Sequence, residues 1–308
     1  MSWKAYPLIF RLKSPLHIGW RKVGNLHQTR SYVTGKVVWA ALTARLTRLG
    51  FPIKSDIEGE TEYVQVGTQL NQEFAFSYFF PAIKNKVESA LFPKLEAGGV
   101  TYGDNSMLES EFQYLLFDSY ASTALDYARL DKEEGSLHET EFIRSQTRPF
   151  DGEELGVPVY LVGYLFAKNS IDLFSNALTK IQLGAERRYG WGRIQLANQN
   201  LEPTNELIFH RWQLNSYDSI RPEITAKADT FLPAHAIAAD SLLPSVGNTV
   251  KGVIEPLVGR ETNDANYFGR KIARARICWL PGSNVEKNAA MAIGNYGIWE
   301  GLTKNTNN

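Results

Sequence analysis

The stretch Pro158-Val-Tyr-Leu-Val-Gly-Tyr-Leu-Phe-Ala-Lys168 decides how this chain is expected to fold. It is a continuous apolar run enriched in strand formers, which predicts a buried strand. Ser170 can then cap a helix that Gly184 closes, and residues 193–197 have the pattern of another strand. The apolar stripe of that helix consists of Leu173, Phe174, Ala177, Leu178 and Ile181. The region therefore predicts a strand, a helix and a second strand.

The N-terminal part begins with a strand and a helix of its own. Residues 6–13 alternate apolar and polar side chains, as a half-buried strand does. After a loop that we expect from Ser14 to Thr34, apolar residues recur at helical spacing until Gly50. Strand, helix, a variable middle, strand, helix, strand is the order of an α+β domain of the ferredoxin-like (RRM-like) type. Such a sheet is a common platform for RNA.

The length of 308 residues favours two domains. We expect residues 1–200 to form the ferredoxin-like domain, with an insertion at about 52–156 that contains a helix near Leu108 to Arg129. Residues 201–308 are punctuated by Gly and Pro. They predict a second, smaller domain that is ferredoxin-like or otherwise β-rich.

The composition indicates a soluble protein of a reducing compartment. Cys278 is the only cysteine, so it has no intramolecular disulfide partner, and no Cys/His cluster has the spacing of zinc ligands. Arg11 and Lys13 interrupt the first apolar segment, which argues against a signal peptide or a membrane span. Gly35-Lys36 lacks the spacing of a P-loop. We expect a cytoplasmic location, no metal and no cofactor.

Charge is unevenly distributed although the formal net charge is zero. The segment from Met1 to Ser55 has many Lys and Arg but no Asp or Glu, and acids crowd into the ranges 56–62 and 131–154. This asymmetry predicts a basic face that suits a polyanion. The alternative is a basic surface that is merely solvated.

The turn Gly184-Ala-Glu-Arg-Arg-Tyr-Gly-Trp-Gly-Arg193 combines three types of side chain that suit RNA. Its glycines permit positive φ and close approach of another chain. Its arginines can grip phosphates, and Tyr189 or Trp191 can stack on a base. In the alternative interpretation the turn is a tight connection, its arginines pair with acids such as Glu186, and the protein is a scaffold that binds only proteins.

Two N-terminal motifs accompany this turn: Ser14-Pro-Leu-His-Ile-Gly19 and Tyr32-Val-Thr-Gly-Lys36. Together with Gly184 to Gly192, which is similar to the family's glycine-rich loop, they resemble the CRISPR-associated RAMP superfamily. The resemblance implies ferredoxin-like domains that assemble around a guide RNA (crRNA). It covers residues 6–50 and 140–197.

Residues 252–260 and 278–283 are similar to large subunits of type III effector complexes that bind the 5′ handle of the guide. The partners that this implies are guide RNA, other CRISPR effector subunits and, as a further candidate, target RNA. The RNA-binding residues that we predict are His17, Gly19, Arg21, Lys22, Arg30, Lys36, Gly184, Arg187, Arg188, Tyr189, Gly190, Trp191, Gly192 and Arg193.

A noncatalytic role is favoured, with one alternative. Slicing RAMP subunits use an Asp in the loop after the first strand, whereas residues 18–31 contain no acid. Guide-processing RAMP nucleases often use a histidine near this place, so His17 and His27 are candidates for general acid–base chemistry. His27 has basic neighbours that suit a metal-independent endoribonuclease and is the stronger of the two.

Overall fold

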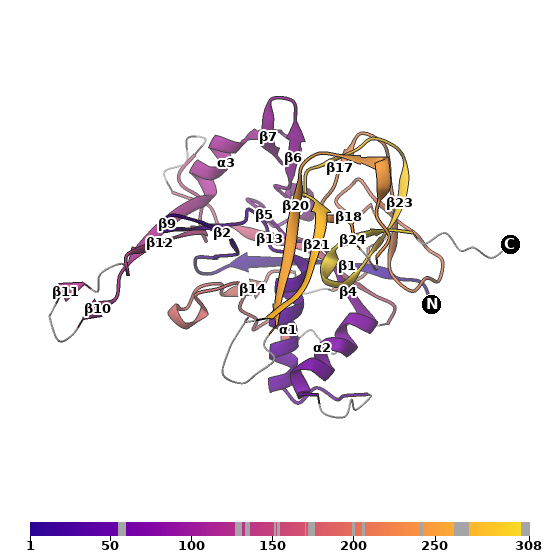
Figure 1. Ribbon diagram of the computed structural model, residues 1–308, viewed down its shortest axis with the longest axis horizontal. Coiled ribbons are helices and arrows are strands. Elements are labelled where there is room, and N and C mark those ends of the chain that lie inside the picture. The colour runs from indigo at the N-terminus through magenta and orange to yellow at the C-terminus, as the bar shows by residue number, and fades with distance from the viewer. Residues whose placement is uncertain are drawn as a thin grey trace.

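A five-stranded antiparallel sheet forms the centre of the molecule (Figure 1). The computed structural model describes residues 1–54, 60–126, 131–132, 136–150, 152, 155–169, 171, 176–198, 201–204, 207–240, 243–261 and 271–302. The strand order is β14 (Ile194–Leu196), β1 (Lys4–Leu12), β13 (Tyr160–Ala167) and β4 (Phe74–Phe76), and β5 (Phe80–Ala82) also pairs with β13. The longest pairing joins β1 to β13, from Lys4 opposite Ala167 to Arg11 opposite Tyr160.

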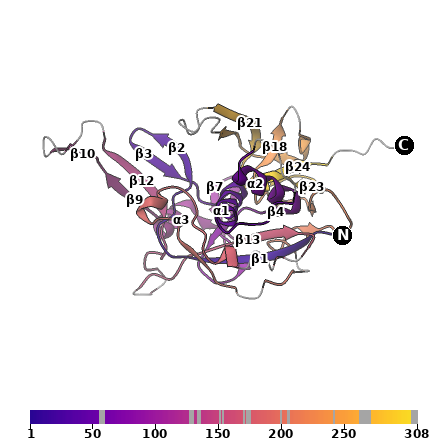
Figure 2. The same ribbon diagram turned by 90° about the horizontal axis from the view of Figure 1, so that it is seen from below.

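Two helices cover one face of this sheet: α1 (Gly35–Arg48) and α2 (Glu62–Glu73). They lie side by side (Figure 2), and the Trp39 indole N–H of α1 donates to the carbonyl oxygen of Gly67 in α2 at 3.0 Å. The stripe of α1 that packs on the sheet contains Val38, Ala41, Leu42 and Leu46. The helical spacing thus predicted this helix correctly, and Gly50 follows it with a φ of +68°.

The predicted strands at residues 6–13, 158–168 and 193–197 are present as β1, β13 and β14. The expectation that β1 is half-buried is wrong, because Ala5 and Ile9, on the face opposite Leu8 and Phe10, are also buried. Residues beyond position 200 cover that second face. Of the predicted helix after Ser170, residues 176–178 are helical, and Ser170 with 172–175 lie outside the described residues.

The expected loop from Ser14 to Thr34 contains a hairpin instead. Strands β2 (Gly19–Val23) and β3 (Leu26–Thr29) pair with each other, and β3 runs parallel to β12 (His138–Ile143). Every residue of β2 is exposed, so this strand has no apolar alternation that a sequence pattern could reveal.

The helix predicted near Leu108 to Arg129 is too long. Helix α3 (Glu109–Leu116) ends at Phe117, where β9 (Phe117–Ser122) begins to pair with β12. Pairing between segments distant in sequence overrides the local helical pattern here. The β9–β12 pair continues into β10 (Leu125–Asp126) and β11 (Asp131–Lys132), and together they form an arm that points away from the body (Figures 1 and 2).

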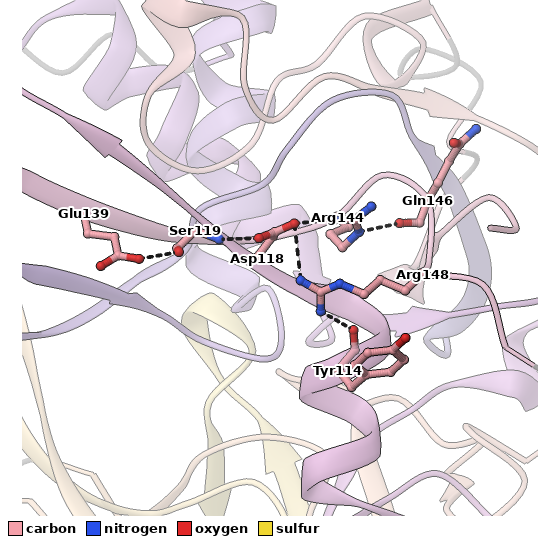
Figure 3. Close-up of polar contacts among 7 residues, drawn as sticks. All are labelled: Tyr114, Asp118, Ser119, Glu139, Arg144, Gln146 and Arg148. Carbon is pink, nitrogen blue, oxygen red and sulfur yellow. Dashed lines mark hydrogen bonds and ion pairs between the residues drawn. The ribbon is translucent and has the colours of Figure 1, made fainter. Parts of the chain in front are cut away.

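A polar network fixes the base of this arm to α3 (Figure 3). The Asp118 carboxylate, on β9, accepts a hydrogen bond from Arg144 and lies 3.4 Å from a guanidinium nitrogen of Arg148. Arg148 also donates to the carbonyl oxygen of Tyr114 at 2.5 Å, near the negative end of α3. Both arginines are therefore paired with protein groups, and the network acts as a structural anchor.

The remaining strands form three further groups. A seven-stranded sheet has the order β15 (Gln213–Leu214), β16 (Glu223–Ala226), β23 (Ala289–Ile293), β24 (Trp299–Gly301), β18 (Ala236–Ala239), β21 (Lys271–Trp279), β20 (Ile254–Glu261). Two three-stranded sheets are β17 (Thr230–Phe231), β22 (Asn284–Val285), β19 (Val250–Lys251), and β6 (Pro93–Glu96), β7 (Gly99–Tyr102), β8 (Met107–Leu108). The described residues from 201 onward contain strands and short 3₁₀ turns but no α-helix.

The chain as a whole is a mixed α+β structure with many strands and few helices. The second hydrophobic core lies between the C-terminal part and the face of the central sheet that α1 and α2 do not cover. It contains Ile9 and Phe166 together with Trp212 and Trp299. Because one core holds residues from both sides of position 200, the division into domains at 1–200 and 201–308 stays a prediction. No helix within the described ranges is long and apolar enough to span a membrane.

Gly35 is the residue at which α1 meets the C-terminal part. A Cβ at this position would lie 2.5 Å from the carbonyl oxygen of Tyr296. We expect Gly35→Ala to lower the free energy of unfolding by about 2 kcal/mol, because this backbone contact cannot rotate away. Urea denaturation measures the change.

The matched control is Gly98→Ala, since a Cβ at Gly98 would meet no atom within 4 Å. It should change stability by less than about 0.5 kcal/mol. Equal effects of the two substitutions would contradict the close approach of Tyr296 to α1.

Candidate nucleic-acid interface

The glycine-rich turn and the Ser14–Gly19 motif lie far apart in the sequence but form one backbone-bonded unit. The amide of Ala185 donates to the carbonyl oxygen of His17 at 3.0 Å, and the amide of Gly192 donates to that of Pro15 at 2.7 Å. The amide of Arg193 donates to the Ser14 hydroxyl at 2.9 Å. The two motifs singled out in the sequence are thus brought together.

The glycines of the turn are required by its backbone conformation and by close backbone contacts at Gly184 and Gly192. Gly184, Gly190 and Gly192 all have positive φ. A Cβ on Gly184 would lie 2.2 Å from the carbonyl oxygen of His17, and one on Gly192 would lie 1.8 Å from that of Leu183. Their role is therefore geometric, as the structural interpretation of the turn expects.

The arginines of the turn behave differently from its glycines. Arg187, Arg188 and Tyr189 form an exposed 3₁₀ turn, and the Tyr189 side chain is 81% exposed. Within the described part of the chain neither arginine forms an ion pair, although Glu186 is adjacent. The expectation that these arginines serve only to pair with local acids finds no support in the geometry.

Trp191 anchors the turn. Its ring lies edge-on to Phe142 of β12, with 5.0 Å between centroids and a 65° angle between planes, and it is half-buried. Of the two aromatic residues expected to stack on a base, Tyr189 is the one whose ring faces solvent.

A cavity of about 300 Å³ lies between the turn and the start of α1. Arg187, Gly184, Gly19 and Arg30 line it, together with Thr34 at the N-terminus of α1. The Thr34 side chain makes no capping hydrogen bond, and the first turn of α1 has no acidic residue, so the positive end of the helix dipole is not compensated there. The arrangement suits a phosphate group.

Lys36 is exposed on the first turn of α1, and its ammonium group lies 5.7 Å from the ring centroid of Tyr296. Arg21 and Lys22 are exposed on β2. Arg193 is exposed at the end of the turn. These predicted RNA-binding side chains are available to a ligand.

Arg30 lies in a buried cluster. It is 12% exposed, forms a 2.8 Å ion pair with Glu255 of β20, and donates to the Tyr32 hydroxyl at 2.9 Å. His235, 0% exposed, donates from Nε2 to Glu255 at 2.6 Å, and its Nδ1 accepts from the Tyr78 hydroxyl at 2.7 Å. Arg30 reaches the cavity, but its charge is already paired.

The ionisation of this cluster follows from its contacts. Burial acts to raise the pKa of Glu255, but the hydrogen bond from His235 and the charge of Arg30 outweigh it and lower that pKa to about 2. Burial lowers the pKa of His235, which is consistent with a neutral ring between a hydroxyl donor and a carboxylate acceptor. Glu255 is therefore ionised at neutral pH.

The two histidine candidates have different surroundings. His17 is buried, and its Nδ1 lies 2.7 Å from the carbonyl oxygen of Glu141, which fixes it as a structural donor. His27 is half-buried and stacks on His138 of β12 with 5.4 Å between centroids. Burial and the charge of Lys22 lower the pKa of His27. In the described part of the chain no group of three or more His, Cys, Asp or Glu is placed to hold a metal.

The sequence interpretation missed Trp20. This side chain is 40% exposed, the Arg21 guanidinium carbon lies 4.1 Å from its ring centroid, and its indole N–H donates to Glu255 at 3.2 Å. The available signal was a tryptophan between Gly19 and two basic residues in an acid-free segment.

Comparison with known proteins finds likeness at the level of the fold. No family model matches the sequence, and no curated protein matches it. A chain of the type III-B Cmr-beta cryo-EM structure bound to cognate target RNA and AMPPnP superposes with a TM-score of 0.53 and 13% identity, covering 91% of this chain and 85% of that one. A chain of Cmr-beta bound to cognate target RNA gives 0.51 and 14%, covering 91% and 86%. At these identities the likeness concerns the fold alone.

Acid is expected to weaken the fold through the Glu255 cluster. The folded pKa of about 2 lies below the ordinary 4.5, so the stabilisation, about 3 kcal/mol, is complete above pH 4.5 and is lost as the pH falls towards 2. His235 adds to the loss below its ordinary pKa of 6.5, because the unfolded chain binds a proton that the buried neutral ring does not.

Urea unfolding of the wild type and Glu255→Gln between pH 7 and pH 3 measures this. The variant should be less stable at pH 7 and should lose less stability than the wild type below pH 4.5. Parallel curves in that acidic range would contradict the depressed pKa of Glu255.

Proposed function

We propose that this chain is a noncatalytic guide-RNA-binding subunit of a type III CRISPR effector complex. In this proposal the Gly184–Arg193 turn and the basic N-terminal segment hold the RNA. The observation that carries the proposal is the pair of exposed arginines, Arg187 and Arg188, which have no ion-pair partners in the described structure. Arg187 also lines the cavity at the positive end of α1. Both features suit phosphates.

The strand order supports a RAMP-type ferredoxin-like domain in residues 1–200. Taken in chain order, β1, β4, β13 and β14 are the four strands of a βαββαβ unit, and their order across the sheet is fourth, first, third, second. The two central strands, β1 and β13, then come one from each βαβ half, and α1 covers one face of the sheet. Residues 201–308 are the proposed second domain.

Two further observations support RNA and other effector subunits as partners. The segment from Met1 to Ser55 has no acid to repel a phosphate backbone. The structurally similar chains come from Cmr-beta complexes bound to cognate target RNA. Binding of the guide's 5′ handle rests on the resemblance of residues 252–260 and 278–283 to large type III subunits.

The same segment argues for holding RNA instead of cutting it. Residues 18–31 contain no Asp or Glu at which a slicing carboxylate would stand. His17 is engaged by the backbone of Glu141. Recognition through phosphates and shape is expected in a subunit that binds many guide sequences.

Reversal of both exposed arginines is the direct test. We expect Arg187→Glu/Arg188→Glu to weaken binding of guide RNA at least tenfold, since two phosphate contacts become repulsive. The slope of log affinity against log salt should become shallower by about 1.4, the share of two contacts to single-stranded RNA. Filter binding over a salt series measures both quantities.

Lys227→Glu/Lys287→Glu is the control, because it makes the same change in net charge at two exposed positions outside both the turn and the basic N-terminal segment. It should weaken binding much less. Unchanged affinity of the Arg187/Arg188 variant would reject the proposal and favour a scaffold whose partners are only proteins.

A second candidate function is metal-independent endoribonuclease activity at His27. The observation that favours it is the His27–His138 stack beside Lys22, because cleavage through the 2′-hydroxyl needs one group to accept a proton and another to donate one. A lowered pKa keeps His27 neutral at pH 7 and able to accept.

Incubation with labelled repeat RNA in EDTA separates the two functions. The noncatalytic proposal expects intact RNA. Product that disappears in His27→Ala but persists in His210→Ala, an exposed histidine outside this stack, would establish the nuclease instead.

A further inference from the structure

We propose that Trp20 and Arg21 on β2 form a stacking platform for one unpaired nucleobase of the bound RNA, and that Glu255 is the positioning residue that holds it. This inference rests on the proposed function. It adds a base contact to an interface that otherwise recognises phosphates.

The platform is a stack that is already assembled. The Arg21 guanidinium carbon lies 4.1 Å from the Trp20 ring centroid. Arg21 Nε donates to the Gln28 side chain of β3 at 2.6 Å, which holds the guanidinium in place. Unpaired RNA bases stack on both aromatic rings and guanidinium planes, so a base can extend this stack without displacing Arg21.

Glu255, on β20 in the C-terminal part of the chain, holds the Trp20 indole ring in place. One carboxylate oxygen accepts from the Trp20 indole N–H at 3.2 Å, and the other binds Arg30 and His235. The polar edge of the indole is thus satisfied by protein, while 40% of the side chain stays exposed. A pre-oriented aromatic ring loses little conformational freedom when it binds a base.

The surroundings favour RNA over a protein partner. Every residue of β2 is exposed, and Trp20 is followed by Arg21 and Lys22. An apolar protein surface that covered the indole would also bury these two charges, which is unfavourable without partners. A nucleotide instead brings a phosphate that pairs with them. Trp20 also adjoins the phosphate-sized cavity, because Gly19 and Arg30 line that cavity.

The test uses a guide RNA series in which one nucleotide at a time lacks its base. In wild-type protein one position should lose about tenfold in affinity when its base is removed, the usual effect of one stacked base. In Trp20→Leu, removal of the base at that position should cause no further loss of affinity. In Trp20→Phe, it should cause part of the loss seen in the wild type. Tyr217→Leu, at another exposed aromatic residue, should behave like the wild type.

Glu255→Ala tests the positioning role with a spectroscopic measurement. The Trp20 emission, obtained by subtracting the spectrum of Trp20→Phe, should be quenched by RNA in the wild type and less so in Glu255→Ala. Arg187→Glu/Arg188→Glu should still weaken RNA binding at least tenfold when it is introduced into Glu255→Ala, because the phosphate contacts of these two arginines do not depend on Glu255.

Three outcomes would overturn the inference. In the first, Trp20→Leu binds every RNA of the series as the wild type does. In the second, Trp20→Leu lowers the affinity for every RNA of the series by the same factor. In the third, RNA quenches the Trp20 emission equally with and without the Glu255 carboxylate. If Arg187→Glu/Arg188→Glu still weakens binding in the same assay, the proposed function survives and only the base contact fails. If that variant also binds normally, the proposed function fails first.

Discussion

Burial of both faces of the β1–β13 pair is the constraint on which the rest of the structure depends. One face packs under α1 and α2, and the other packs against the C-terminal sheet through residues such as Ile9 and Phe166. A strand buried on both sides needs a cover on each side, so neither part of the chain completes its core alone. The edges of the sheet and the loops at its ends are then the places left for function.

Glycines and arginines have different roles in the candidate interface: the glycines set the path of the backbone, and the arginines are available to a ligand. Gly184 lets the turn cross the Ser14–Gly19 segment, and Gly192 lets it close on the backbone of Leu183, at distances that no side chain tolerates. These two contacts set where Arg187 and Arg188 stand. The rigid part is thus backbone, while the groups that meet a ligand are long side chains. Such a loop presents its cations from a fixed base without specifying a sequence, which suits recognition of phosphates.

Sequence patterns predicted the elements that have a clear apolar period. The alternation at residues 6–13, the helical stripe in α1 and the continuous run in β13 each reflect local burial. The hairpin of β2 and β3 escaped prediction because β2 is exposed throughout and so has no apolar alternation. The arm escaped prediction because β9 and β12 pair across a long intervening segment. Arg30 looked like a free cation because its partner, Glu255, lies in the C-terminal part of the chain. Long-range pairing of charges leaves no trace in a local pattern.

The Glu255 cluster and the contact between Tyr296 and Gly35 both tie the C-terminal part to the side of the N-terminal part that carries the candidate interface. Their consequence concerns the exchange of parts between proteins of this fold. A chimera that takes its C-terminal half from a relative would leave Arg30 and Trp20 facing a foreign surface, and it would place a new loop against α1. Substitutions at Trp20, Arg30 and Gly35 are therefore expected to occur together with substitutions in the part of the C-terminal half that contacts them.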